Sequence, residues 1–188
     1  MTALLLAALT GVVGVGINSN GMPLVSDQTV ECPNEAKDGR YRKAYEQGGR
    51  FLKGECQGGL ATGDWRAWHA NGEKMWKGTL DHGKLQGSFK SWHDTGKLRA
   101  RGRFKDGEPV GFWIYFHRDG SLAARGRWVE GEEAGCWKTR YADGRRREKG
   151  AYVDGDKVKN WYRWGPSGRD KESFGGSTEQ GRCWWPLL

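Results

Sequence analysis

The sequence predicts an all-β fold, a single-layer antiparallel β-hairpin solenoid of about six 24-residue repeats. Two observations predict it. Glycines recur at fixed places along the chain, and an aromatic residue stands two positions after the glycine that begins each unit. Self-similarity at a fixed period of this length is the signature of a repeat architecture. The glycines that begin the units are spaced by 24 residues, at Gly39, Gly63, Gly87, Gly111 and Gly135.

Each unit has the pattern of a β-hairpin. In the unit that begins at Gly63, we expect strands over residues 64–69 and 74–80, joined by a turn at Asn71-Gly72. Asn-Gly and Asp-Gly pairs favour the positive φ angles of tight hairpin turns. A second turn, such as Asp106-Gly107 in the following unit, leads into the next hairpin. Consecutive hairpins of this kind build one long, twisted sheet.

The composition indicates how such a sheet packs. The chain has 31 Gly and 11 Trp among 188 residues, and only 36% of it is hydrophobic. Disordered chains are poor in aromatic residues, so the many Trp residues favour a folded chain whose large rings replace Leu and Ile in the core. The net charge of +8 permits attraction to any polyanion but selects none.

Two columns of the repeat are expected to form the packed face. The ring column holds Tyr41, Trp65, Phe89, Trp113, Trp137 and Trp161. The facing glycines, in the second strand of each hairpin, are Gly54, Gly78, Gly102, Gly126 and Gly150. Because side chains alternate across a strand, each ring should be the cross-strand partner of the glycine in its own hairpin. We therefore expect each ring to lie over that glycine, and we assign both columns a structural role.

The opposite face is expected to carry a row of cations. This basic row consists of the pairs Arg42 and Lys53, Arg66 and Lys77, Lys90 and Arg101, Ile114 and Arg125, and Lys138 and Lys149. Like charges directly opposite each other destabilise a sheet, so another advantage must favour them. An aromatic column lies on the same face, at Trp68, Trp92, Phe116 and Trp164. Regularly spaced cations with rings between them suit a linear polyanion or a sugar chain.

Eight residues of this face are the candidate binding site: Arg66, Trp68, Lys77, Lys90, Trp92, Arg101, Arg125 and Lys149. The alternative is a face that is charged for solubility alone. In that case the acidic turn residues Asp106, Glu130 and Asp154 neutralise part of the charge, and the stems of Lys and Arg cover the rings. The sequence leaves both interpretations open.

No catalytic residue, cofactor or metal ligand is predicted. His69, His93 and His117 recur once per hairpin, and successive hairpins lie about 10 Å apart, which is too far for them to share one metal ion. The carboxylates stand in turns rather than as a converging pair. Neither a Ser-His-Asp spacing nor a phosphate-binding loop is recognisable. We therefore expect a protein without enzyme activity.

The ends of the chain differ from the repeats. Residues 1–26 carry no charge and resemble a signal peptide, although no Lys or Arg precedes the apolar run. We expect an N-terminal cap over 27–38, the repeat array over 39–174 and an irregular C-terminal cap over 175–188. This organisation predicts a periplasmic or secreted protein. The alternative is a cytoplasmic protein with an apolar leader.

The four cysteines fit two disulfides in an exported protein. Chain order suggests Cys32–Cys56 and Cys136–Cys183, although three pairings are possible. Cys32 and Cys56 are separated by one period, and equivalent places in adjacent hairpins are about 10 Å apart. A disulfide needs Cα atoms within about 7 Å. The first bridge therefore requires an irregular N-terminal cap.

The unit pattern matches a known repeat. Residues 87–92, Gly-Ser-Phe-Lys-Ser-Trp, and residues 102–107, Gly-Arg-Phe-Lys-Asp-Gly, carry it most clearly. The pattern, which covers 39–164, resembles the MORN repeat family in a bacterial, antitoxin-like variant. The resemblance implies an array of hairpins and an interaction role.

These features together predict a monomeric, non-catalytic repeat scaffold. We expect it to bind a partner protein, an anionic polymer or an anionic lipid surface, in the bacterial cell envelope or outside the cell. Sequence-specific binding of nucleic acid is not expected. The resemblance also implies an alternative, a cytoplasmic antitoxin-like protein that neutralises a toxin by direct contact.

Overall fold

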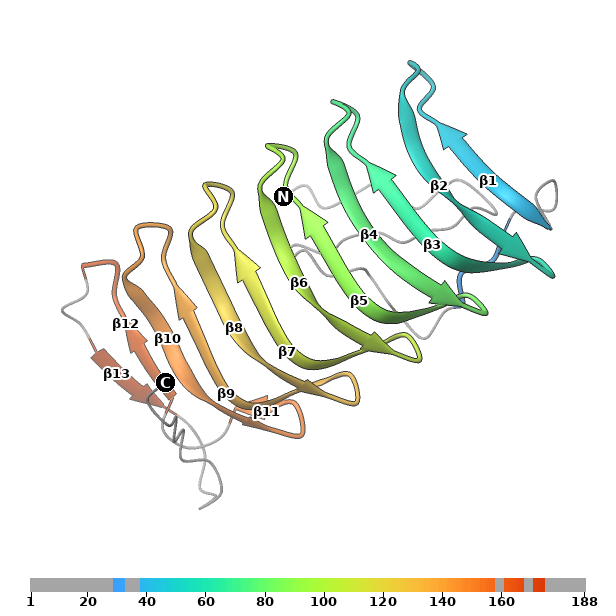
Figure 1. Ribbon diagram of the computed structural model, residues 1–188. Coiled ribbons are helices and arrows are strands. Elements are labelled where there is room, and N and C mark those ends of the chain that lie inside the picture. The colour runs from blue at the N-terminus through green and yellow to red at the C-terminus, as the bar shows by residue number, and fades with distance from the viewer. Residues whose placement is uncertain (1–28, 33–37, 158–160, 168–170, 175–188) are drawn as a thin grey trace.

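The strands form one open antiparallel sheet (Figure 1). The computed structural model describes residues 29–32, 38–157, 161–167 and 171–174, and these ranges contain no helix, hence none long and apolar enough to cross a membrane. Each strand pairs with the next in chain order from β1 to β10, then come β12 and β13, while β11 pairs with β10. The prediction of an all-β fold is confirmed. The strands are β1 (Gly39–Ala44), β2 (Arg50–Gln57), β3 (Leu60–Trp68), β4 (Lys74–Asp81), β5 (Lys84–Trp92), β6 (Leu98–Lys105), β7 (Glu108–Phe116), β8 (Leu122–Val129), β9 (Glu132–Arg140), β10 (Arg146–Val153), β11 (Asp156–Lys157), β12 (Trp161–Trp164) and β13 (Lys171–Phe174).

The register within each hairpin is the predicted one. In the hairpin β3–β4, Trp65 pairs with Gly78. The equivalent pair in β5–β6, 24 residues later, is Phe89 with Gly102. The first strand of each hairpin begins earlier than expected, since β5 starts at Lys84. The reason is that the preceding turn has only two residues and returns the chain directly to the ladder.

Two kinds of turn alternate along the sheet. At one edge, the Gly72 amide donates to the His69 carbonyl at 2.9 Å, and Gly72 takes a φ of 86°. At the other edge, both residues of the turn have positive φ, as at Asp106 (53°) and Gly107 (89°). This second geometry is that of a type I′ turn. The Asx-Gly pairs of the sequence therefore serve two different turns.

A bulge between successive hairpins accounts for the glycines that begin the second to fifth units. Lys53 pairs with Arg66, and Glu55 pairs with Thr62, so three residues of β3 lie opposite Gly54. Gly63, within this bulge, has a φ of 68°, an angle that residues with a side chain rarely adopt. A bulge bends its strand and increases the local twist. Equivalent glycines with positive φ are Gly87, Gly111 and Gly135.

From Trp65 onward, each ring of the column lies against a glycine of the preceding hairpin, so the expected contact within one hairpin is wrong. A Cβ atom added to Gly54 would come within 2.1 Å of the Trp65 ring, although Trp65 pairs in register with Gly78. The bulge is the cause, because it leaves Gly54 without a pairing partner in the next strand, β3, and lets the ring fold over it. The same contact joins Trp113 to Gly102, Trp137 to Gly126 and Trp161 to Gly150.

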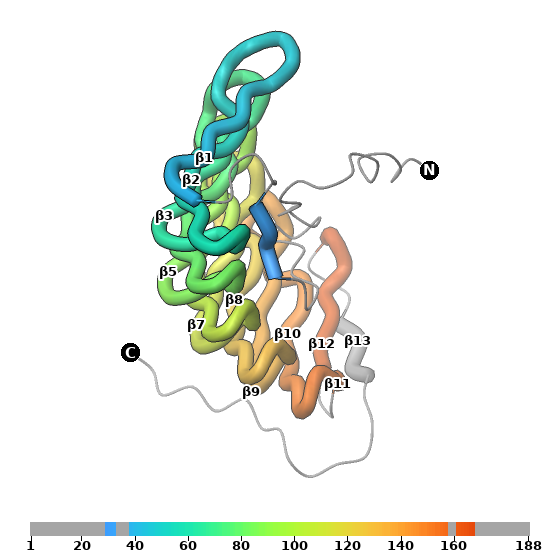
Figure 2. Tube along the Cα trace, turned by 90° about the vertical axis from the view of Figure 1, so that its right-hand side faces the viewer, coloured from blue at the N-terminus to red at the C-terminus, as the bar shows by residue number. Residues whose placement is uncertain are grey.

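The rings continue from hairpin to hairpin as one core on the inner face of the sheet. Trp65 and Trp113 are fully buried, with 0% of their surface exposed. Phe104 meets Trp113 edge-on with ring centroids 5.1 Å apart, and Tyr152 meets Trp161 in the same way at 5.0 Å. Edge-to-face pairs of this kind add to the free energy of burial. Figure 2, which looks along the array, shows the hairpins stacked behind one another.

A short N-terminal segment, residues 29–32, closes the first disulfide. Its Val30 amide donates to the Gly83 carbonyl at 2.8 Å, and its Cys32 amide donates to the Gly59 carbonyl at 2.8 Å. Cys32 is therefore held at the turn edge of the sheet rather than in a hairpin equivalent to that of Cys56. The two Cα atoms lie 6.2 Å apart, and the predicted Cys32–Cys56 disulfide is formed.

The predicted leader (1–26) and C-terminal cap (175–188) lie outside the described residues, and so does Cys183. The domain boundaries and the Cys136–Cys183 pairing therefore stay predictions. Among the cysteines that the structure describes, none is a free thiol.

The contact between ring and glycine predicts that adding one methyl group to the glycine strongly lowers the free energy of unfolding. Gly102→Ala places a Cβ atom 2.1 Å from the Trp113 ring, so we expect a loss of about 1–3 kcal/mol in the free energy of unfolding. Gly78→Ala is the matched control, since its Cβ atom meets Phe89 and Leu85 at 3.1 Å and should cost less. Urea unfolding followed by Trp fluorescence measures both. Equal stability of the two variants would contradict the packing described here.

Candidate anion-binding face

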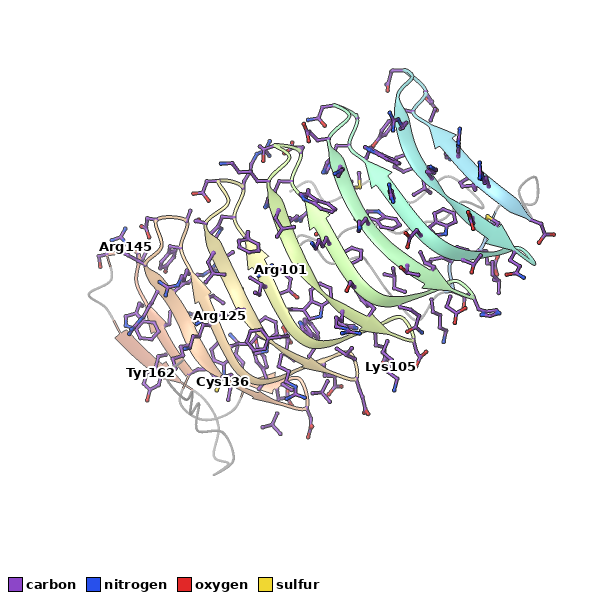
Figure 3. The ribbon with its side chains drawn as sticks, in the orientation of Figure 1. Arg101, Lys105, Arg125, Cys136, Arg145 and Tyr162 are labelled. Atoms are coloured by element: carbon purple, nitrogen blue, oxygen red, sulfur yellow. A yellow bond between two sulfur atoms is a disulfide. The ribbon has the colours of Figure 1, made fainter. Side chains whose placement is uncertain are left out.

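The basic row crosses the sheet from strand to strand, and Ile114 interrupts its cations (Figure 3). Arg66 pairs with Lys77 inside one hairpin, and Lys77 also pairs with Lys90 of the next hairpin. Direct neighbours in such a ladder have Cβ atoms about 4.5–5.5 Å apart. In Figure 3, Arg101, Arg125 and Tyr162 mark the line of the row. In order, the row runs Arg42, Lys53, Arg66, Lys77, Lys90, Arg101, Ile114, Arg125, Lys138, Lys149 and Tyr162.

The row lies on the face opposite to the rings. Trp76 is buried, while its neighbour Lys77 is exposed. Of the candidate cations, four are exposed, namely Arg66, Lys77, Lys90 and Arg101, and two are half-buried, namely Arg125 and Lys149. Six of the eight candidate residues thus lie in the basic row, and their role in binding stays a prediction.

Carboxylates do not neutralise the exposed part of the row. Within the described ranges, the ion pairs lie elsewhere, as between Arg118 and Asp94 at 2.7 Å, and none includes the four exposed candidate cations. The turn carboxylate of Asp106 accepts a hydrogen bond from Gln86 at 2.7 Å instead. The four cations thus have other cations as their nearest charged neighbours in the ladder.

Crowding of like charge is strongest toward the C-terminal end of the row. Burial lowers the pKa of Lys138, and the charges of Arg125 and Lys149 on either side lower it further. Arg146 and Arg140 act in the same direction. The ammonium group of Lys138 therefore lies among positive charges that oppose its protonation.

The two candidate Trp residues lie beside the row, and each is covered by a cation of the preceding hairpin. The guanidinium of Arg50 lies 5.6 Å from the Trp68 ring centroid, and the ammonium of Lys74 lies 5.9 Å from that of Trp92. Both rings are half-buried. These contacts favour an architectural role for Trp68 and Trp92, in line with the alternative that cationic side chains cover the rings.

The histidine column forms hydrogen bonds between successive hairpins. The Nε2 atom of His69 lies 3.0 Å from the Trp92 carbonyl, and that of His93 lies 3.0 Å from the Phe116 carbonyl. His117 makes the same contact with Arg140 at 2.9 Å. Since the acceptors are carbonyl oxygens, each Nε2 carries the proton. Sequence reasoning excluded a shared metal for these residues but missed this role.

Tyrosine takes the same role in two other units. The hydroxyl of Tyr45 donates to the Trp68 carbonyl at 2.7 Å, and that of Tyr141 donates to the Trp164 carbonyl at 2.8 Å. In the sequence, this column can be found as a His or Tyr that follows the outer-face aromatic position by one residue in each of five units. The column holds the hairpin loops in line and leaves the basic row as the candidate functional surface.

In the part of the chain that the structure describes, no group of three or more His, Cys, Asp or Glu side chains is arranged to hold a metal ion. This face presents a line of cations on an antiparallel sheet. Such a line suits the binding of anionic groups.

Comparisons with known proteins identify no relative. No protein-family model matches the chain, and no curated protein is significantly similar to it in sequence. The resemblance to the MORN repeat therefore rests on the residue pattern of the chain itself.

Because like charges are neighbours along the row, we expect the row to lower the free energy of unfolding. Lys90 lies between Lys77 and Arg101, so Lys90→Glu should raise the free energy of unfolding by about 0.2–1 kcal/mol. The gain should fade as salt screens the charges. Urea unfolding at low and high salt measures the effect.

A control for this prediction changes the same charge outside the row. Lys84 pairs with Asp81 at a turn, so Lys84→Glu brings two carboxylates together and should lower stability at low salt. Destabilisation by Lys90→Glu to the same degree would contradict the idea that the row is under electrostatic stress.

Proposed function

We propose that this protein is a non-catalytic repeat scaffold that binds an anionic polymer along its basic row. The observation that carries the proposal is the uninterrupted line of cations from Arg42 to Arg101, on a face without neutralising carboxylates among the described ion pairs. Cross-strand pairing of like charges lowers stability. An anionic ligand that neutralises the cations of the row would offset this loss.

The spacing of the row favours an extended polymer over a compact ligand. Neighbouring strands of a sheet are about 4.8 Å apart, and equivalent strands of successive hairpins are about 10 Å apart. A chain with anionic groups at either spacing can meet one cation per strand or per hairpin. Cations aligned in this way release counterions on binding, so affinity should fall steeply with salt.

We further propose that the sheet is a MORN-like hairpin solenoid of about six units. The support is the pairing of ring and glycine, which recurs at the same period from Tyr41 with Gly54 to Trp137 with Gly150. Because the array repeats one hairpin along its length, two basic positions per unit become one long row across the sheet.

The Cys32–Cys56 disulfide supports a location in an oxidising compartment. We propose the periplasm or the exterior of the cell, with residues 1–26 as the export signal. The alternative of a cytoplasmic, antitoxin-like protein fits less well, because cytosolic proteins rarely keep such a bond.

Binding to heparin, a sulfated linear polymer, tests the proposed function. The double variant Lys77→Glu with Arg101→Glu should elute from a heparin column at clearly lower salt than the natural protein, because two cations in the centre of the row become repulsive. The matched control is Lys84→Glu with Lys105→Glu, which makes the same change in net charge at the turn edge, where Figure 3 shows Lys105.

The control pair should elute close to the natural protein. Equal loss of retention in both double variants would mean that net charge alone matters, and would overturn the role of the row.

Export predicts two properties of the native protein. A signal peptide should be removed, leaving an N-terminus near residues 17–26, and a thiol reagent should find no reactive cysteine before denaturation. N-terminal sequencing and thiol titration measure these properties. Retained Met1 together with four reactive thiols would contradict export.

A further inference from the structure

Strand β7 carries three apolar side chains on the outer face, where each equivalent strand carries at least one charged residue. These side chains belong to Phe112, Ile114 and Phe116, which we call the apolar stripe. They alternate with the buried rings of Trp113 and Tyr115 on the inner face. The fourth unit thus departs from the repeat pattern. The equivalent residues are Asp64, Arg66 and Trp68 in β3, Ser88, Lys90 and Trp92 in β5, and Cys136, Lys138 and Arg140 in β9.

Part of this apolar surface is open to solvent. Phe112 is 46% exposed, and Val129 on the neighbouring strand β8 is 45% exposed. Among the residues that the structure describes, these two are the exposed large hydrophobic side chains. They lie close together, because Val129 is two residues from Arg127, the cross-strand partner of Phe112, and on the same face. Contiguous apolar surface that is rimmed by polar residues marks a contact site for another molecule.

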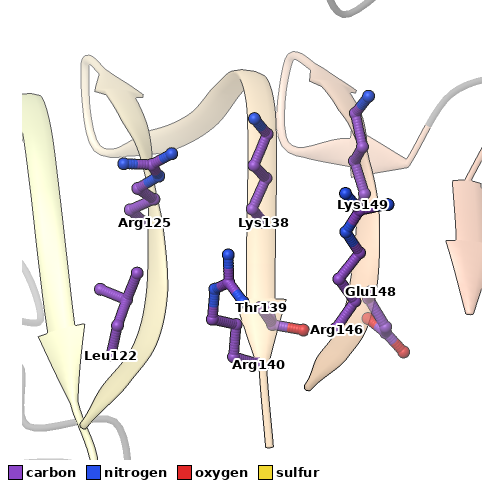
Figure 4. Close-up of a pocket in the computed structure, with 8 residues that line it drawn as sticks. All are labelled: Leu122, Arg125, Lys138, Thr139, Arg140, Arg146, Glu148 and Lys149. Carbon is purple, nitrogen blue, oxygen red and sulfur yellow. The ribbon is translucent and has the colours of Figure 1, made fainter. Parts of the chain in front are cut away.

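Two leucines extend the stripe at the end where Phe116 lies. Leu122 pairs directly with Phe116, and Figure 4 shows Leu122 on β8, below Arg125, in the lining of an adjacent pocket. Leu98 occupies the place at which Lys74 covers a ring one unit earlier. Both leucines therefore replace the cation that other units place at this position, namely Arg50, Lys74 and Arg146.

Arginines border the stripe on both sides. Arg101 of β6 pairs with Ile114, and Arg127 of β8 pairs with Phe112. Figure 3 shows Arg101 and Arg125 on the two strands that flank β7. Within the described ranges, the ion pairs include neither Arg101 nor Arg127. An apolar centre with a charged rim is the usual anatomy of a protein interface, and this rim requires anionic groups on the partner.

The dimensions of this surface match those of an α-helix. Strands β6 and β8 are two strand spacings apart, about 10 Å, and an α-helix with its side chains is about 10–12 Å across. Phe112 and Phe116 are four residues apart along β7, about 13 Å, which is the length of roughly two and a half helical turns. A helix laid along β7 would place apolar residues on the stripe and acidic residues over the arginines of β6 and β8.

Charge and direction separate the possible occupants of the stripe. A second copy of this chain would bring arginines against arginines, and like charges oppose association. The anionic polymer of the proposed function follows the row across the strands, whereas the stripe follows one strand and offers the apolar Ile114 where the two cross. The surface therefore fits a ligand that is apolar along its centre and acidic along its borders.

We propose that the apolar stripe and its arginine borders are a docking site for an acidic amphipathic helix of a partner protein. Phe112 and Phe116 are the anchors, since aromatic side chains at the centre of an interface carry much of the binding energy. The arginines select an acidic partner and oppose a basic one. This ligand is distinct from the anionic polymer of the proposed function. The docking site crosses the basic row at β7, so helix and polymer compete for the same three strands.

A designed peptide tests the docking site on the full chain. The probe is a helical peptide of about 18 residues, with Leu along one face, Glu on both sides of it, and Ala and Lys on the remaining face. Calorimetry at physiological salt should show binding with a stoichiometry of one. A peptide of the same composition in scrambled order should bind roughly tenfold more weakly or less. No binding of the helical peptide, or equal binding of both peptides, would overturn the docking site.

Two substitutions borrowed from β5 remove the stripe with little risk to the fold. Phe112→Ser copies Ser88, and Ile114→Lys copies Lys90. Each should weaken binding of the helical peptide roughly tenfold or more. The matched control combines Phe112→Ser with Ser88→Phe, which keeps the composition but moves the ring to β5. It should bind as weakly as Phe112→Ser alone, and restored binding would overturn the role of the stripe.

Self-association is measured with the same variants. Sedimentation should show no dimer of the natural protein that Phe112→Ser dissociates. Such a dimer would assign the stripe to a second copy of the chain and overturn the docking of a helix.

Ile114→Lys separates the docking site from the proposed function. It places a cation between Arg101 and Arg125 in the row, so heparin retention should rise while peptide binding falls. Weaker peptide binding without higher heparin retention supports the docking site and counts against the polymer role of the row. Higher heparin retention with unchanged peptide binding overturns the docking site and supports the row.

Discussion

The contact between an aromatic ring and the backbone of the preceding hairpin is the constraint on which this structure depends. The described strands form a single sheet, and buried rings such as Trp65 and Trp113 lie against glycines of this sheet. This contact requires three features: a glycine, which has no Cβ atom, a bulge that leaves this glycine without a partner in the next strand, and a second glycine with positive φ inside the bulge. The period of the sequence is the repetition of these three requirements.

This dependence explains which parts of the fold were predictable. Strand type and register follow from alternation and turn position, and both are read directly from the columns around Trp65 and Gly78. The neighbour of each ring was not predictable in the same way, because the bulge adds residues to one strand without changing the pairing inside a hairpin. The position of Cys32 was not predictable either. Segment 29–32 donates hydrogen bonds to the turn carbonyls of Gly59 and Gly83, and no other unit has an equivalent segment among the described residues.

The candidate site was predictable as far as charge was concerned. Alternation alone assigns Lys77 and Lys90 to the face opposite the rings, and the ladder then makes them neighbours. Side-chain contacts between hairpins were the missing part, because they join positions that sequence spacing treats as equivalent rather than adjacent. The bond from His69 to the Trp92 carbonyl and the cation over Trp68 both belong to this class. Through these contacts, His69 and Trp68 stabilise the stacking of successive hairpins.

In a repeat array, function is most visible where one unit stops obeying the pattern. The ring, glycine and histidine columns are explained by packing and hydrogen bonds between hairpins. The basic row repeats the same charge from strand to strand. Arg140 breaks this equivalence, since it places a guanidinium, bonded to the Gly144 carbonyl, where four other units carry a ring. Ile114 breaks it in the opposite sense, because it removes a cation between Arg101 and Arg125. Ile114 therefore divides the row into a longer run of cations, from Arg42 to Arg101, and a shorter run, from Arg125 to Lys149. The anionic polymer of the proposed function would meet two runs of unequal length along the sheet.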